Sequence, residues 1–198
     1  MDGFLKALQE RRSCYALSKE SPVSGEALET LIRQAVKHTP SAFNMQSGRA
    51  VLLLGAHHDK LWQITLETLA AIVPRDRFAA TEQKIAGFAA GHGTVLFFDD
   101  AAVTGAYAQQ NPAYRDNFPV WAQQAAGMLQ LAVWALLEEA GLGASLQHYN
   151  PLIDEAVKQA WQIPDSWQLL AQMPFGAPAG APGEKTFEPL EKRVKVYR

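Results

Sequence analysis

The sequence predicts an α+β fold in which helices cover a central sheet. Short apolar runs at 50–54, 94–98 and 169–173 have the composition of strands, and apolar residues recur at helical spacing in the longer segments around them. The chain has 198 residues, of which 48% are hydrophobic and 19% are charged. A chain of this length and composition can bury a full core, so we expect a single domain over residues 1–198.

The first half of the chain is expected to alternate helices and strands. Ser24 can cap a helix whose apolar residues repeat at helical spacing and which ends before Thr39-Pro40. The uniformly apolar run at 50–54 predicts a strand that is buried on both faces. The other elements expected in this half are helices over 59–72 and 81–90 and a strand over 94–98.

The second half contains the longest predicted helix, over 119–140, which is apolar on nearly all sides and is stopped by Gly141. Such a helix must be covered by the core or by a second subunit, and Trp121 and Trp134 are expected to pack there. The elements expected after it are a strand over 144–149, a short helix over 153–161, a strand over 169–173 and a loop rich in Pro and Gly over 176–183. The tail beyond this loop is apolar again and predicts an arm that docks on another surface.

Composition and charge argue against several classes of protein. The formal net charge is −2, so electrostatics gives no indication of nucleic acid or an anionic membrane as a partner. No secretory signal pattern is visible, and the Gln and Glu residues of the longest helix would be costly in lipid, so we expect a cytoplasmic protein. Cys14 is the single cysteine, and a packing role is favoured over a reactive thiolate. The histidines lack paired ligand spacing, His57-His58 is expected in an exposed turn, and no metal site is predicted.

Two basic clusters lie at opposite ends of the chain. Arg11, Arg12 and Ser13 lie close to the start, and 192–195 carries three further cations close to the end. Guanidinium groups form bidentate, charge-assisted hydrogen bonds with phosphate, and a serine adds a neutral donor. The clusters therefore suggest that one anion is held from both sides. The alternative is that the arginines end a first helix and are solvated, because helix C-termini favour cations.

Two further segments carry polar groups suited to a flat ligand. Ser41, Asn44 and Gln46 lie in a short connection, where they could offer donors and acceptors to the edge of a heteroaromatic ring. Ordinary turn chemistry accounts for them equally well. Gln147-His148-Tyr149 ends a predicted strand and could line a cleft, although buried and satisfied residues would look the same. A half-match to the dinucleotide fingerprint at 141–146 lacks the third glycine and follows a helix, so a Rossmann loop is rejected.

Six motifs, taken in order, resemble one known family. They are RRSCYAL at 11–17, PSAFNMQS at 40–47, GTVLFFDD at 93–100, LQHYNP at 146–151, MPFGAP at 173–178 and EKRVKV at 191–196. Together they span nearly the whole chain and resemble the nitroreductase family of flavoproteins, more specifically its short branch of fungal fatty-acid-repression-mutant-like and lactococcal copper-induced nitroreductases. The resemblance implies a central sheet covered by helices and an obligate homodimer. In such dimers the long helix forms much of the subunit contact, and the C-terminal arm reaches the partner.

The resemblance also implies a cofactor, a reaction and partners. One FMN per subunit is expected in a cleft at the dimer interface. NADH or NADPH would reduce it, and a nitroaromatic or quinone-like small molecule would accept the electrons in a ping-pong hydride mechanism. The flavin carries the chemistry, so no catalytic side chain is expected. The alternatives are an FMN-storage or stress-response flavoprotein whose reductase activity is incidental, and a structural dimer without a cofactor.

By the same resemblance, residues from separate parts of the chain are expected to bind FMN. The N-terminal motif, which should hold phosphate or ribityl oxygens and the polar flavin edge, corresponds to Arg11, Arg12 and Ser13. The C-terminal phosphate clamp corresponds to Arg193 and Lys195. The loop that relatives contribute from the opposite subunit corresponds to Ser41, Asn44 and Gln46. The segment that lies against the ring near flavin N5 corresponds to Gln147, His148 and Tyr149.

Two positions depart from the family pattern. Lys84 corresponds to a lysine that larger relatives place beside the flavin pyrimidine, but its spacing to the strand at 94–98 differs. Tyr15 stands where larger relatives carry a basic residue, two positions after the serine of the N-terminal motif. A cation there stabilises the anionic reduced flavin, so Tyr15 leaves the redox potential and the acceptor range open.

Overall fold

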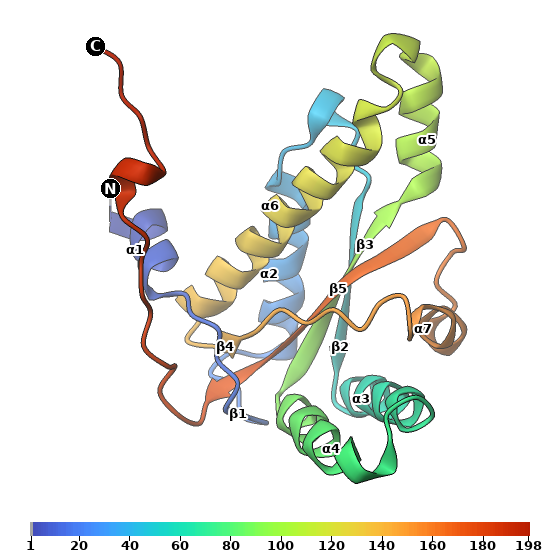
Figure 1. Cartoon of the computed structure of the whole chain (residues 1–198), viewed down its shortest axis with the longest axis vertical. Helices are drawn as coiled ribbons and strands as arrows, with labels where there is room; N and C mark the ends of the chain where they lie inside the picture. The colour runs from blue at the N-terminus through green and yellow to red at the C-terminus, as the bar shows by residue number, and fades with distance from the viewer. Residues whose placement is uncertain (1) are drawn as a thin grey trace.

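The computed structural model describes residues 2–198 and has helices on both faces of an antiparallel sheet (Figure 1). The α-helices are α1 (Asp2–Glu10), α2 (Gly25–His38), α3 (Ala56–Ala70), α4 (Arg75–Ala89), α5 (Ala101–Gln110), α6 (Asn117–Glu139) and α7 (Asp154–Trp161). The strands are β1 (Leu17–Ser18), β2 (Gly48–Leu54), β3 (Gly93–Asp100), β4 (Gly143–Ala144) and β5 (Trp167–Pro178). Short 3-10 turns are η1 (Ala42–Asn44), η2 (Pro112–Tyr114) and η3 (Leu190–Lys192). The predicted α+β class is confirmed.

The sheet has the strand order β1-β5-β3-β2, with β4 paired to β5, and all of these pairings are antiparallel. β3 lies between β5 and β2 and is buried along its whole length, in agreement with the apolar run at 94–98. A bulge between Phe97 and Phe98 leaves Leu170 as the extra residue on β5. A bulge disrupts the hydrogen-bond ladder locally, and this one lies two residues before Gln172.

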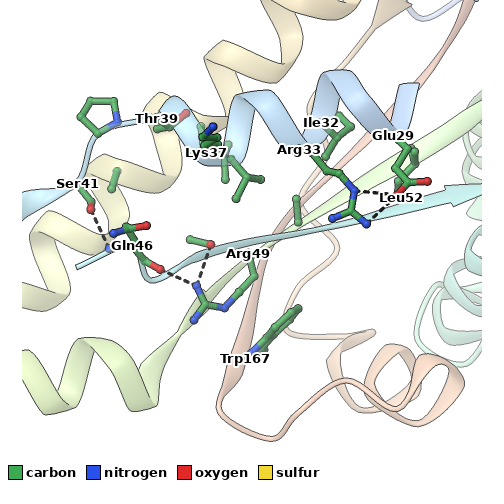
Figure 2. A pocket seen from close by; sticks show the side chains of 16 residues that line it. Glu29, Ile32, Arg33, Lys37, Thr39, Ser41, Gln46, Arg49, Leu52 and Trp167 are labelled. Atoms are coloured by element: carbon green, nitrogen blue, oxygen red, sulfur yellow. Dashed lines mark hydrogen bonds and ion pairs between the residues drawn. The ribbon is translucent and has the colours of Figure 1, made fainter. Parts of the chain in front are cut away.

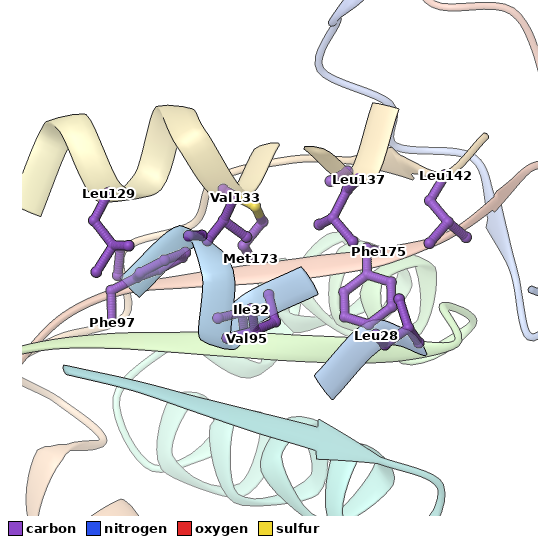
Figure 3. Packing of buried hydrophobic residues seen from close by; sticks show 13 residues of the cluster. Leu28, Ile32, Val95, Phe97, Leu129, Val133, Leu137, Leu142, Met173 and Phe175 are labelled. Atoms are coloured by element: carbon purple, nitrogen blue, oxygen red, sulfur yellow. The ribbon is translucent and has the colours of Figure 1, made fainter. Parts of the chain in front are cut away.

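Helices cover the two faces of the sheet separately, as the alternation of side chains along a strand requires. On one face, Val95 and Phe97 of β3 pack with buried residues of α2 and α6, among them Leu129 (Figure 3). On the other face, Leu96 and Phe98 pack with buried residues of α3, α4 and α7. Full burial of a side chain of this size contributes about 1.5–3 kcal/mol to folding, so several such contacts hold the helices on each face.

The helix boundaries follow local chemistry. At α2 the Ser24 hydroxyl accepts a hydrogen bond from the Ala27 amide, and the helix ends at His38, as predicted. α4 begins at Arg75, several residues before the predicted start at 81, directly after Pro74. α5 is not predicted at all, because its residues are mostly small and its apolar positions show no helical periodicity.

The His57-His58 pair is not in an exposed turn, which corrects the prediction. Gly55 has a positive φ of 54°, which turns the chain directly from β2 into α3, so both histidines lie in the first turn of that helix. His57 is exposed, whereas His58 is buried. The His58 Nε2 donates to the Ala89 carbonyl at 3.2 Å, and its Nδ1 accepts from the Thr94 hydroxyl at 2.9 Å. Burial lowers the pKa of His58 and favours this neutral form.

Three predicted strand features are also corrected. β2 is mostly half-buried instead of buried on both faces, because it is an edge strand that pairs with β3 alone within residues 2–198. The predicted strand at 144–149 is only the short β4, followed by an isolated bridge between Gln147 and Gln172. β5 runs on to Pro178, so it includes the start of the predicted loop at 176–183.

Helix α6 carries exposed apolar side chains as well as buried ones. Met128 and Leu131 are 43% and 39% exposed, while the opposite side of the helix packs on the sheet and on α2. An 18-residue window of α6 has a mean hydropathy of 1.2, which by length and composition alone would allow a membrane span. Core helices of soluble proteins pass the same test, so this is weak evidence for a membrane. The predicted bounds of this helix, 119–140, agree with α6 within two residues.

Candidate functional site

The N-terminal motif forms a hollow on the surface, which we call the cationic hollow. Its volume is about 440 Å³, and it is lined by Arg11, Arg12, Ser13, Tyr15, Gly183, Glu184, Lys185 and Thr186. The sheet fixes the backbone here, because Ser13 forms a β-bridge with Ala144 and the Cys14 amide donates to the Ala144 carbonyl at 2.9 Å. Two arginines and a hydroxyl thus share one concave surface, an arrangement suited to an anion.

The two arginines of the hollow have no carboxylate partner among the side chains of residues 3–198. The Arg11 guanidinium lies over the Trp134 ring, 4.4 Å from its centroid, and Arg12 donates to the Gly183 carbonyl. A guanidinium has five N–H donors, so both side chains keep donors for a ligand. Stacking on Trp134 orients Arg11 without neutralising its charge.

Cys14, beside this hollow, is buried, as expected for a packing residue. Burial raises the pKa of its thiol, which disfavours the thiolate form. Within residues 2–198, no group of three or more His, Cys, Asp or Glu side chains could hold a metal ion.

The residues after β4 form a strand-edge segment, 145–150, that lies along β5. Gln147 and Gln172 exchange backbone hydrogen bonds, with N···O distances of 2.7 and 2.9 Å. The Tyr149 amide donates to the side-chain oxygen of Gln172 at 2.7 Å. His148 lies between these anchored residues, is exposed, and its amide has no hydrogen-bond partner in the described chain, 2–198. The amides of Leu146 and Asn150 likewise have no partner among residues 2–198, and of these free donors the amide of His148 is the one that lies between two anchored residues.

The side chain of Tyr149 packs inward, towards α3 and α4. Its ring centroid lies 6.0 Å from that of Trp62 and 6.4 Å from that of Phe88. Burial raises the pKa of the Tyr149 hydroxyl. Lys84 is exposed on α4, with its Nζ 5.9 Å from the Phe88 ring, which in turn packs on Tyr149. Lys84 does not line the cationic hollow.

Residues 41–46 form a strained connection, the amide loop. Phe43, Asn44 and Gln46 have positive φ values of 54°, 52° and 52°. A non-glycine residue in this region carries strain of about 1–3 kcal/mol, and such strain concentrates at functional sites. The Ser41 hydroxyl accepts from the Gln46 amide at 2.9 Å, which closes the loop and leaves Asn44 exposed.

Aromatic side chains anchor the amide loop at the N-terminal end of α6. The Phe43 ring stacks on Trp121, with centroids 5.9 Å apart, and contacts Phe118 at 5.3 Å and Tyr114 at 6.0 Å. Phe43 and Tyr114 are both exposed. These contacts hold the strained backbone in place without the help of a ligand.

Ser41 and Gln46 also line a groove of about 530 Å³ beside α2, α6 and β2 (Figure 2). Arg49 of β2 donates to the Gln46 carbonyl at 2.6 Å and forms an ion pair with Asp100 at 2.9 Å. The amide loop is therefore tied to the ends of both β2 and β3.

The cationic hollow and the amide loop lie at opposite ends of α6. Arg11 stacks on Trp134, and Phe43 stacks on Trp121. A helix rises about 1.5 Å per residue, so these two contacts are roughly 20 Å apart along the axis. One chain therefore does not bring the two groups of candidate residues together.

Arg193 and Lys195 are also separated from the N-terminal arginines. They lie on the arm, 183–198, and are exposed like its other residues. Neither lines the cationic hollow, to which the start of the arm contributes. Within one chain, the structure does not join the two basic ends of the sequence.

Two residues at the site were missed or given another role by sequence reasoning. Gln172 is completely buried in the apolar run 169–173, and a glutamine inside such a run is the signal that could have found it. Trp134 is predicted as a core or interface residue, yet it also lies beneath Arg11. The Trp134 Nε1 and the Ser47 hydroxyl, which follows the amide loop, are buried without a partner in the described residues. Each candidate group thus has an unsatisfied polar atom close to it.

Known proteins resemble this chain over nearly its whole length. The sequence model of the Nitroreductase family matches residues 8–177. HBN1 of Saccharomyces cerevisiae is 38% identical over 196 residues, which are 98% of this chain and 96% of HBN1. Nitroreductase CinD from Lactococcus lactis, solved in complex with chloramphenicol and with 4-nitrophenol, is 44% identical with a TM-score of 0.90, over 98% of this chain and 100% of CinD. A more distant nitroreductase from Desulfitobacterium hafniense with bound FMN shares the fold, with a TM-score of 0.72 at 16% identity over 100% of both chains.

Proposed function

The chain belongs to the nitroreductase family of oxidoreductases, and from this membership we propose that it is a cytoplasmic, homodimeric, FMN-dependent enzyme. Its electron donor is NADH or NADPH, and its acceptors are nitroaromatic or quinone-like small molecules. The observation that carries the proposal is the cationic hollow, whose arginines lack carboxylate partners and which adjoins the strand-edge segment through the bridge between Ser13 and Ala144.

The residues present fit FMN in both its charge and its ring. Arg11, Arg12 and Ser13 offer donors to the phosphate and ribityl oxygens, and Trp134 holds the Arg11 guanidinium in place. The free amide of His148 offers a donor to the ring near N5. Tyr15 stands where larger relatives carry a cation, so another residue must stabilise the reduced ring. Lys84 lies outside the hollow, and we therefore assign this role to Arg11.

When bound, FMN supplies the two-electron chemistry between the nicotinamide donor and the acceptor. The side chains of this protein bind and orient, and none acts as a nucleophile or general acid. By the resemblance, the His148 amide would lie near flavin N5, where it would offer the ring a fixed hydrogen-bond donor without reorganisation.

Two surfaces support the homodimer. An apolar groove of about 570 Å³ runs between α1, α2 and α6, and Phe4, Met128 and Leu131 line it. The arm exposes further large apolar side chains, among them Phe187 and Tyr197. Exposed apolar patches of this kind on a folded chain favour association with another protein surface.

The dimer also completes the cofactor site. Because the cationic hollow and the amide loop of one chain lie roughly 20 Å apart, we propose that Ser41, Asn44 and Gln46 of one copy contact the ring held by the hollow of the other. Arg193 and Lys195 reach a phosphate in the same way, through the arm. The unsatisfied Ser47 hydroxyl beside the amide loop fits a surface that is covered on assembly.

The acceptor class is supported by CinD, whose structures contain chloramphenicol and 4-nitrophenol, both of which carry a nitro group on an aromatic ring. We extend this class to the present chain. A flat, electron-poor ring would suit a site that holds FMN, because aromatic rings stack on one another.

The visible spectrum of the purified protein, before and after anaerobic addition of NADH or NADPH, tests the cofactor and the reaction together. The proposal predicts a yellow protein with one FMN per chain that bleaches with NADH or NADPH and regains its colour with a nitroaromatic acceptor. A yellow protein that bleaches no faster than free FMN would instead support the storage function. A colourless protein that takes up no added FMN would contradict the proposal.

A further inference from the structure

On the basis of the proposed function, we infer that Gln172 is a positioning residue that sets the direction of the strand-edge segment, so that the His148 amide faces the flavin. Gln172 lies on β5, is 0% exposed and cannot itself reach a ligand. It acts through Tyr149.

The bulge in β5 removes the acceptor that Tyr149 would otherwise use. Gln147 pairs with Gln172, so in a regular antiparallel ladder Tyr149 would face Leu170. Leu170 is the extra residue of the bulge, where the ladder is disrupted. The Tyr149 amide is therefore left without a backbone carbonyl opposite it.

The side chain of Gln172 takes the place of that carbonyl. Its Oε1 accepts from the Tyr149 amide at 2.7 Å, and its Nε2 donates to the Asn150 side-chain oxygen at 3.4 Å. The backbone of Gln172 already holds Gln147. One residue thus anchors the segment on both sides of His148.

This anchoring decides where the His148 amide points. Successive amides along an extended segment face opposite directions, and those of Gln147 and Tyr149 both face β5. The amide of His148 therefore faces away from β5, towards solvent, with no partner in residues 2–198. Without the Gln172 carboxamide, the strand-edge segment would be held on the C-terminal side of His148 by the packing of the Tyr149 ring.

That packing is a competing explanation, because contacts of the Tyr149 ring with Trp62 and Phe88 also hold the segment. A loss of stability alone would not distinguish the two. The test must therefore read the Tyr149 amide and the flavin directly.

The variants remove, shorten or replace the carboxamide of Gln172. Gln172→Met removes both acceptor and donor at similar volume. Gln172→Asn keeps the carboxamide but shortens its reach by one methylene, so it tests the same point where the Met variant does not fold. Gln172→Glu keeps an acceptor, and burial favours its protonated form, which also donates. Gln168→Met, at an exposed glutamine on the same strand, is the matched control.

The first readout is amide hydrogen exchange in the full-length protein without FMN. In the Met and Asn variants we expect the Tyr149 amide to exchange at least about tenfold faster, since it loses its only acceptor, while the Gln147 amide keeps its protection. The Glu variant and the Gln168→Met control should match the wild type. Unchanged protection of Tyr149 in a folded Met or Asn variant would overturn the inference.

The second readout is the flavin. Loss of one hydrogen-bonded anchor should weaken FMN binding about five- to tenfold in the Met and Asn variants. N5 of the oxidised ring accepts a hydrogen bond, whereas N5 of the reduced ring carries a hydrogen, so a misdirected His148 donor costs the oxidised ring more. Oxidised FMN should therefore lose up to about tenfold more affinity than reduced FMN, which raises the two-electron potential by about 30 mV. The Glu variant should restore both values.

The outcomes separate this inference from the proposed function. If the wild type binds no FMN, the proposed function fails, and the amide exchange of Tyr149 still tests the anchor. If the wild type binds FMN and a folded Met or Asn variant keeps its affinity and potential, Gln172 is not a positioning residue for the flavin, and the Tyr149 ring holds the segment.

Discussion

The two ends of α6 present different kinds of surface. At its C-terminal end, the cationic hollow carries arginines without carboxylate partners, on a backbone held by the sheet. At its N-terminal end, the amide loop is uncharged, and aromatic rings hold its backbone in a strained conformation. The distance between them is roughly 20 Å, so the charged surface and the uncharged loop of one chain do not share a cleft. A complete site of the proposed kind therefore needs two copies of the chain.

The largest loss of FMN affinity is expected from a substitution that prevents two copies of the chain from forming a dimer. Leu131→Asp places a charge in the apolar groove of α6, where burial without a partner is costly. We expect a monomer that binds FMN more than about 100-fold more weakly, a change of about 2.8 kcal/mol. Sedimentation equilibrium and FMN titration measure both effects.

The control for this variant is Ile72→Asp, because Ile72 is an apolar residue that is 56% exposed after α3, on the other face of the sheet. It should remain dimeric and keep its FMN. A dimeric Leu131→Asp protein with wild-type affinity for FMN would place the subunit contact elsewhere.

Removing charge from the hollow should have the next largest effect. Hydrogen bonds to charged groups contribute about 1.5–3 kcal/mol, so Arg12→Ala should weaken FMN binding about 10- to 100-fold while riboflavin, which has no phosphate, is affected far less. Arg12→Lys, which keeps the charge but loses the guanidinium geometry, should lie between. Isothermal titration with both ligands measures the difference. Arg77→Ala, an exposed arginine on α4, is the control, and equal losses for FMN and riboflavin would contradict a phosphate site.

Low pH should lower the free energy of unfolding through a buried histidine on the face of the sheet that supports the strand-edge segment. The folded state holds His58 neutral with a lowered pKa, so the unfolded chain binds a proton more readily below its ordinary value of 6.5. Stability is therefore lost as pH falls below about 6.5, by up to about 1.4 kcal/mol per pH unit, until His58 is protonated in the folded state. Urea unfolding of wild type and His58→Gln between pH 7.5 and 5.5 should show this slope in the wild type only.

The comparison with His58→Gln also isolates the histidine from the carboxylates Glu138 and Asp154, because burial raises their pKa values in both proteins. His57→Gln, at the exposed neighbour, should keep the wild-type slope. If His58→Gln and the wild type lose stability in parallel, the buried histidine does not couple folding to pH.

The smallest expected effect is at the amide loop. Asn44→Gly relieves a positive φ of 52°, so the free protein should gain roughly 0.5 kcal/mol while FMN binding weakens about threefold through the lost side chain. Gln162→Gly relieves the same conformation at the end of α7 and should leave FMN binding unchanged. Thermal unfolding and FMN titration of both variants measure this, and equal effects on FMN would remove the loop from the site.

Much of the fold could be predicted because its helices and central strand carry a clear period. Ser24, the apolar face of α2 and the run of β3 fix their elements within a few residues. The strand-edge segment could not be predicted correctly, because its alternating pattern also fits a strand and nothing local reveals the bulge at Leu170. Likewise, the apolar positions of α5 show no helical periodicity, and only its packing defines it.

The sequence indicates which residues are candidates for the site, but not how the fold arranges them in space. Arginine pairs and amide-rich loops have recognisable chemistry, so residue type marks Arg11, Arg12 and Asn44 as candidates, and their roles toward FMN remain predictions from the family resemblance. Their separation along α6, and the hydrogen bond that Gln172 accepts close to the bulge of its own strand, depend on contacts between residues far apart in the sequence. Such contacts leave no local pattern.

The claim that one site is built from two copies is tested most directly by mixing defective subunits. An Arg12→Ala chain and an Asn44→Ala, Gln46→Ala chain, carrying different affinity tags, are unfolded, refolded together and purified as mixed dimers. In such a dimer, one site combines the intact hollow of one chain with the intact amide loop of the other. Our account predicts one FMN per mixed dimer bound with wild-type affinity, whereas a mixed dimer in which neither site reaches wild-type affinity would contradict it.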